Sequence, residues 1–190
     1  MFIEAIILGM VIGLITKRRI SNLYSIEIKG WHFIILAVLI QYLPIILKSF
    51  DFIKFDYNYF TLAGNIIILI IVLINREIKS SLVIFLGGLI NTIAFYINGM
   101  KIPLLESIAS NQMIELIRSG RILNYKLVEE LTRWELYLGK IVKVPDVYPF
   151  ARPLSIGDII IMLGLVLLIV REMDKTYFKN KGAMLRFPYR

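Results

Sequence analysis

Four polar side chains in otherwise apolar stretches have the residue types that could do chemistry. The clearest is Asp158, near the start of RPLSIGDIIIMLGLVLLIV (152–170), and the others are the amides Gln41, Asn65 and Asn91. A carboxylate in apolar surroundings usually points inward and is paired, because exposing it to hydrocarbon is costly. Such a group could act as an acid or base, or hold a polar ligand. The four residues are therefore candidate ligand-binding residues.

Each of these side chains also has a purely structural interpretation. The three amides could be hydrogen-bond links between helices, which contribute about 0.6 kcal/mol each on average. Asp158 could cap its own helix, since acidic groups are favourable in the first turn, where the helix macrodipole is positive. From the sequence, a ligand site and a set of structural links both stay open.

The segments that carry these residues are long and apolar. Hydrophobic residues make up 58% of the 190-residue chain and the mean hydropathy is +0.74, whereas soluble domains hold about 45–50% apolar residues. The composition favours an all-α integral membrane protein with five transmembrane helices and an extracytoplasmic amphipathic segment before the last span. The expected spans are 2–16, 31–47, 59–75, 81–97 and 154–170.

The distribution of positive charge predicts which way such spans would run. Basic residues concentrate in segments 17–30 and 76–80 and in the tail 171–190, whereas lysines and aspartates balance in 48–58. We therefore expect a multi-pass protein of the cell membrane with its N-terminus outside and its C-terminus in the cytoplasm. With that sidedness, all four polar residues fall about 6–9 Å deep in the outer leaflet.

Residues 98–153 depart from the pattern of short connections. Apolar residues at helical spacing predict two amphipathic helices, at about 103–119 and 124–138. This pair could lie on the membrane surface or cover the helical bundle as a lid. The prolines of KVPDVYPFARP (143–153) prevent a continuous helix and predict an extended path into the last apolar segment.

Composition also narrows the possible partners. The absence of cysteine excludes disulfides, thiolate metal sites and cysteine nucleophiles. The net charge of +8 is explained by basic residues near anionic headgroups, without nucleic-acid binding. No phosphate loop, dinucleotide fingerprint, HExxH or serine–histidine constellation is present. We expect no metal and no cofactor, and as partners membrane lipids or another membrane protein.

Three motifs carry a resemblance to a known family: NGMKIP (98–103), LTRWELYLGKIVKVP (131–145) and PLSIGDIIIMLG (153–164). With these motifs the chain resembles a bacterial membrane-protein family of unknown function, domain of unknown function 5317. The sequence departs from the family pattern at Met100 and Ile102, and Lys140 stands where the middle motif has an acid. The resemblance implies a small polytopic bacterial membrane protein and supplies no activity.

The PLSIGDIIIMLG motif also resembles the last span of lipoprotein signal peptidases, where a similar sequence supplies one of two catalytic aspartates. By this resemblance Asp158 would be one member of the pair. The other motif of those enzymes has no counterpart here, although Glu4, Glu106 or Asp146 could be imagined as the partner. An aspartyl mechanism needs two carboxyl groups that share a proton.

Three functions are compatible with these observations. The favoured one is a non-enzymatic partner or assembly component of the cell membrane. The alternative is binding or transport of a lipid-like or small ligand at the cluster of Asp158, Asn65, Asn91 and Gln41. The third is a membrane enzyme that uses Asp158 on a lipid-linked or peptide substrate. A pocket with a second carboxyl near Asp158 would favour the enzyme, whereas the lack of any cavity would leave only structural links.

Overall fold

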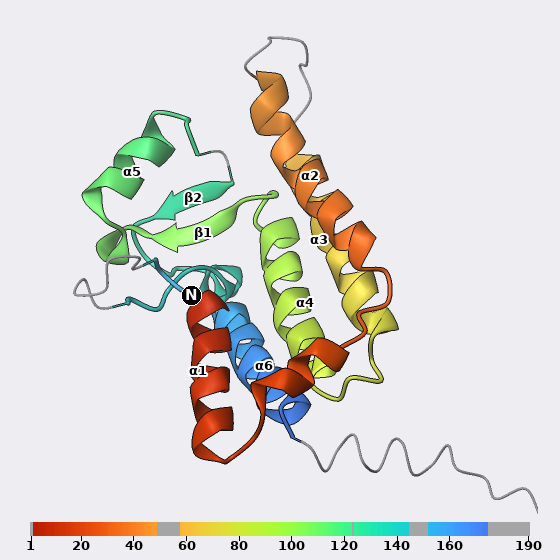
Figure 1. Cartoon of the computed structure of the whole chain (residues 1–190). Coiled ribbons are helices and arrows are strands. Elements are labelled where there is room, and N and C mark those ends of the chain that lie inside the picture. Colours follow the sequence, from red (N-terminus) through yellow and green to blue (C-terminus); the bar gives the residue numbers. More distant parts are fainter. Residues whose placement is uncertain (1, 49–57, 123, 145–151, 175–190) are drawn as a thin grey trace, which may run out of the picture.

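The computed structural model describes residues 2–48, 58–122, 124–144 and 152–174. Long helices lie side by side, and a small β–α–β unit covers one end of them (Figure 1). The boundaries lie within two residues of those expected from the apolar runs. The long helices are α1 (Phe2–Ile15), α2 (Trp31–Lys48), α3 (Asn58–Ile74), α4 (Ser81–Ile97) and α6 (Ile156–Glu172).

The prediction of five transmembrane helices is wrong, and with it the classification as a polytopic membrane protein. In the described part of the chain, no helix combines the length and the apolar character needed to cross a bilayer. Helices of 14 to 18 residues are about 21–27 Å long at about 1.5 Å per residue, against about 30 Å for a hydrocarbon core. The expected depths of the four polar residues depended on these spans and lose their basis.

The spatial order of the helices differs from their order in the chain. Helix α6 packs between α1 and α4, α4 packs against α3, and α3 packs against α2. Glycines allow the closest approaches. A Cβ atom on Gly9 would lie 2.9 Å from the Cβ of Ile169, and one on Gly87 would lie 2.6 Å from the carbonyl oxygen of Gly157. Glycine at these positions therefore sets how closely α6 lies against both neighbours.

The β–α–β unit and the segment that follows it, described over residues 102–122 and 124–142, form what we call the cap of the molecule. Strands β1 (Ile102–Leu105) and β2 (Tyr125–Val128) are parallel, with Ile102 opposite Tyr125. Because parallel strands need a crossover connection, the chain between them passes through the short 3-10 helix η2 (Glu106–Ile108) and α5 (Asn111–Arg118). The 3-10 helix η3 (Trp134–Leu138) follows β2.

The cap corrects the prediction of two amphipathic helices. The first expected helix, 103–119, is instead the end of β1, then η2 and the short α-helix α5. Ser110 caps α5 by accepting a hydrogen bond from Met113 N at 3.3 Å. The second expected helix, 124–138, is instead β2 followed by η3. Its local pattern suits a helix, but pairing with β1, more than 20 positions earlier, satisfies the backbone of Tyr125–Val128. Tertiary context overrides a weak local preference here.

Two backbone contacts tie the cap to the start of α6. The N–H of Lys140 donates to the carbonyl of Pro103 at 2.7 Å, on the edge of β1. Two residues further on, Val142 and Leu154 exchange two hydrogen bonds of 3.0 Å. The expected extended path is seen at Leu154, whereas 145–151 lie outside the described residues. Elements β1 and η3 pack against α4. The cap therefore lies against the helices, as expected of the lid alternative for residues 98–153.

The buried core is small relative to the apolar content of the chain. Its largest fully buried apolar side chains are Phe95, Leu104 and Met173, at the α4–cap and α1–α6 contacts. Many large apolar side chains on the outer faces of the helices are exposed, for example Ile3 at 71%. The apolar runs therefore serve helix packing on one side and leave apolar surface on the other.

Candidate functional site

Asp158 lies buried in the first turn of α6 and caps that helix. Its Oδ2 accepts a hydrogen bond from the backbone N–H of Ser155 at 2.9 Å. In return, Ser155 Oγ accepts one from the backbone N–H of Asp158 at 3.1 Å. This reciprocal pair is a capping box, so the helix-cap interpretation of Asp158 is confirmed.

Asn91 of α4 connects the capping box at the start of α6 to α4. Its Nδ2 donates to Asp158 Oδ1 at 2.9 Å, and its Oδ1 accepts from Ser155 Oγ at 2.7 Å. The two helices come close enough because Gly157 has no side chain: a Cβ atom there would overlap Asn91 Oδ1. The amide therefore links α4 to α6, as the structural interpretation expected.

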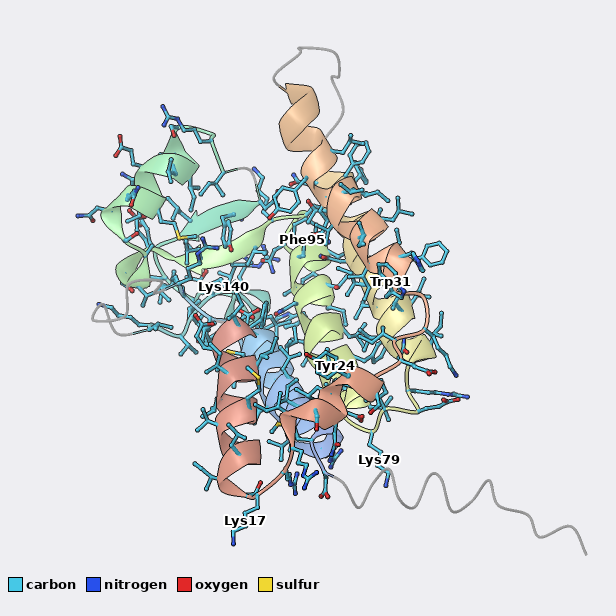
Figure 2. The ribbon with its side chains drawn as sticks, viewed as in Figure 1. Lys17, Tyr24, Trp31, Lys79, Phe95 and Lys140 are labelled. Atoms are coloured by element: carbon cyan, nitrogen blue, oxygen red, sulfur yellow. The ribbon has the colours of Figure 1, made fainter. Side chains whose placement is uncertain are left out.

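The β–α–β cap contributes Lys140 to this group of linked side chains, which we call the cluster: Asp158, Ser155, Asn91 and Lys140. Its Nζ donates to Asp158 Oδ2, and this ion pair is shielded, with side chains 14% and 6% exposed. The contact follows from the backbone, because Lys140 lies on the edge of β1 and Leu154, just before the α6 cap, pairs with Val142. Figure 2 labels Lys140 where the cap meets the helices.

Gln41 and Asn65 form a second link, between α2 and α3. Gln41 Nε2 donates to Asn65 Oδ1 at 3.1 Å. A Cβ atom on Gly64 would overlap the Gln41 side chain, so this glycine makes room for it. The structural interpretation therefore holds for all three amides, and the ligand-binding role of the four residues stays a prediction.

A cavity of about 360 Å³ lies between α3, α4, α6 and the cap. It brings Asp158, Asn65 and Asn91 to one space, together with Lys140; Gln41 is not among the lining residues and reaches the cavity only through Asn65. The rest of the wall is mainly apolar. Its apolar residues are Phe2, Ile68, Leu69, Val72, Ile84, Ala94, Phe95, Ile102, Leu138 and Ile161.

The described residues do not supply a second carboxyl for an aspartyl mechanism. Asp158 is the acidic residue among those that line the cavity. Glu106 forms an ion pair with Arg118 at 2.6 Å, and Glu4 lines a separate cavity between α1 and α6. Asp146 lies outside the described residues. Nor do the described residues contain a group of three or more side chains that could hold a metal ion.

Sequence reasoning missed two members of the cluster, Lys140 and Ser155. The spacing of Ser155 and Asp158 is that of a capping box before an apolar run and could have identified the serine. Lys140 had no local signal beyond its departure from the family pattern. Its contact with Asp158 depends on how the cap folds back onto α6.

The fold and the cluster define a helical protein with a small β–α–β cap over a cavity whose wall contains a largely buried ion pair. Residues 25–170 match the model of the family of unknown function DUF5317, and the chain belongs to that family. The matched region includes all four predicted site residues, as well as Lys140 and Ser155. No curated protein matches the chain. No solved structure matches it either.

Proposed function

We propose that this protein binds a small amphipathic molecule in the cavity beneath the cap. The observation that carries the proposal is the division of the cavity wall into a polar part at Lys140, Asp158, Asn91 and Asn65 and a remainder that is apolar apart from Thr92. Ligand sites are typically apolar pockets with a few convergent polar groups that orient the ligand. The assembly role favoured from sequence becomes the second candidate.

The position of the residues along the helices supports this division. Val72 of α3 and Ile84 of α4 lie near the short connection 75–80, which makes these two helices antiparallel neighbours. Asn65 and Asn91 each lie seven residues further from that connection, which is about 10 Å along a helix. An apolar tail about 10 Å long would fit beside these helices, with its head group at the amides.

The polar part retains hydrogen-bonding capacity. The ammonium of Lys140 has three N–H donors, and Asp158 takes one of them. Gln41 donates to the oxygen of Asn65, and the Nδ2 group of Asn65 is a further hydrogen-bond donor. These donors can bind an acceptor on a ligand head group.

A fluorescent probe and a variant that fills the cavity test this proposal. The neutral apolar dye N-phenyl-1-naphthylamine should bind the full chain with a saturable rise in fluorescence. Gly88→Leu would place a side chain in the cavity wall, where the nearest neighbour of a Cβ is Leu69 Cδ2 at 3.0 Å, the end of a flexible side chain. This variant should abolish saturable binding while circular dichroism stays unchanged.

The matched control is Leu86→Phe, two positions away on the same helix. Leu86 is 54% exposed and does not line the cavity, so its substitution should leave the saturable phase intact. Equal dye binding by Gly88→Leu and the native chain would show that the dye adheres to exposed apolar surface, and would overturn the proposal.

A second candidate, an assembly role, is favoured by the outer face of α1. Ile3, Ile7, Val11 and Leu14 are 45–71% exposed and lie at helical spacing on one stripe. Such a stripe fits an apolar helix of a partner protein. Co-purification of one stoichiometric partner that Ile7→Lys releases would support this role. A native chain that purifies without a partner would count against it.

A further inference from the structure

We infer that the head group of the bound molecule is uncharged and accepts hydrogen bonds, as a hydroxyl or a carbonyl does. The inference rests on the proposed function and narrows its ligand class. It follows from the way that Lys140 and Asp158 are paired at the cavity wall, and from which of their atoms remain available.

The charges in the cavity already balance. Lys140 and Asp158 are the charged residues among those that line it, and they form an ion pair with each other. A ligand carboxylate that approached Lys140 would also approach Asp158 Oδ2, to which Nζ is bound. Like charges placed together at an interface are strongly unfavourable. A carboxylate head would therefore gain little from Lys140.

A cationic head meets a different obstacle. Both oxygens of Asp158 already accept hydrogen bonds: Oδ1 accepts from Asn91, and Oδ2 accepts from Ser155 N and Lys140. A ligand ammonium that approached Asp158 would also approach the ammonium of Lys140, which is bound to the same carboxylate. The repulsion between the two like charges would offset the attraction to Asp158.

Hydrogen-bond donors remain beside the ion pair. They are the other N–H groups of Lys140 and the Nδ2 group of Asn65, two residues that line the cavity. Donors select an acceptor, and a neutral acceptor also loses less hydration on burial than a carboxylate does. A hydroxyl or carbonyl at the end of an apolar chain has both properties.

The experiment compares three ligands with the same chain and different heads. 1-Octanol, octanoate and octylamine would be titrated calorimetrically into the full chain at pH 7 and one ionic strength. We expect 1-octanol to bind at least about tenfold more tightly than either charged compound, because only the neutral head avoids a like charge in the cavity wall. This comparison needs no variant and so does not depend on the folding of a mutant.

Asp158→Asn tests the role of charge by removing the negative member of the ion pair. Without the carboxylate, Lys140 becomes the charged group of the cavity, and octanoate should gain at least about tenfold relative to 1-octanol. The matched control is Lys29→Met, which removes a lysine from the exposed ion pair with Glu77 and should leave the order of the three ligands unchanged.

The possible outcomes separate the inference from the proposed function. If octanoate or octylamine binds the native chain as tightly as 1-octanol, the inference is overturned and the cavity remains a binding site. If N-phenyl-1-naphthylamine binds saturably and 1-octanol does not bind, the inference is again wrong. If none of these compounds binds, the proposed function fails as well.

Discussion

The ion pair between Lys140 and Asp158 can be measured by a double-mutant cycle of Lys140→Met, Asp158→Asn and the double variant. Each substitution removes a charge and nearly preserves the size of the side chain. The cycle isolates the coupling free energy between the two groups, apart from the effect of each substitution alone. It therefore tests whether the cap is closed on α6 in solution.

The structure gives the expected order of the single effects. Asp158→Asn leaves one acceptor oxygen where Ser155 N, Asn91 Nδ2 and Lys140 Nζ all donate. Removing one partner of a buried ion pair costs about 3–5 kcal/mol, and we expect the free energy of unfolding to fall by that amount. Lys140→Met should cost less, about 1–3 kcal/mol, because Asp158 keeps two N–H donors and the favourable N-terminus of α6.

The double variant should cost little more than Asp158→Asn alone, which corresponds to a coupling of about 1–3 kcal/mol. Guanidinium unfolding followed by far-ultraviolet circular dichroism measures all four free energies. The matched control is the Lys29–Glu77 pair, 3.1 Å apart, with side chains 59% and 70% exposed. Its coupling should be at most about 1 kcal/mol.

Strict additivity at Lys140 and Asp158 would refute the reasoning. A coupling below about 0.5 kcal/mol, equal to that of the control pair, would mean that solvent separates the two charges. The cap would then not be closed on the helices, and the cavity would lose the part of its wall that Ile102, Leu138 and Lys140 provide.

Three further substitutions have defined outcomes. Gly157→Ala would force its new Cβ into Asn91 Oδ1 and should lower the free energy of unfolding by about 1–3 kcal/mol, whereas an unchanged denaturation midpoint would contradict the close α4–α6 contact. Asn75→Ala removes hydrogen bonds of 2.8 and 2.9 Å to the backbone of Lys29 and should cost about 2–3 kcal/mol in the same assay. Ser110→Ala removes the cap of α5 and should cost about 1 kcal/mol, with dye binding unchanged; weakened binding would show that α5 shapes the cavity.

The sequence was sufficient to locate the long helices. Apolar runs end at polar or glycine residues, as at Thr16 and at Asn75, and these stops lie next to the last residues of α1 and α3. The apolar runs could not show whether lipid or other helices surround them. An apolar run of 15–17 residues is compatible with a short span or with a helix that packs against other helices. Among the described residues, no helix is long and apolar enough for a span.

The site was predictable in part. Asp158 was singled out because a carboxylate beside an apolar run must be paired, and the spacing from Ser155 also contains the signal of a cap. Lys140 could not be found in this way. Its position depends on Gly139, where a Cβ atom would overlap the Pro103 carbonyl oxygen, and on the pairing of its backbone with β1. Contacts between distant segments leave no periodic trace in a sequence.

The placement of α6 between α1 and α4 has a consequence for biosynthesis. About 140 residues separate the end of α1 from the start of α6, which corresponds to about 7–28 s of translation at 5–20 residues per second. During that interval α1 has been synthesised, but α6, the helix against which it packs, has not. The hydrogen bond from Asn22 Nδ2 to the Met173 carbonyl, which spans 151 positions, can form only after residue 173 has been synthesised. The nascent chain must therefore keep an apolar helix from premature association until the ribosome releases residues 156–172.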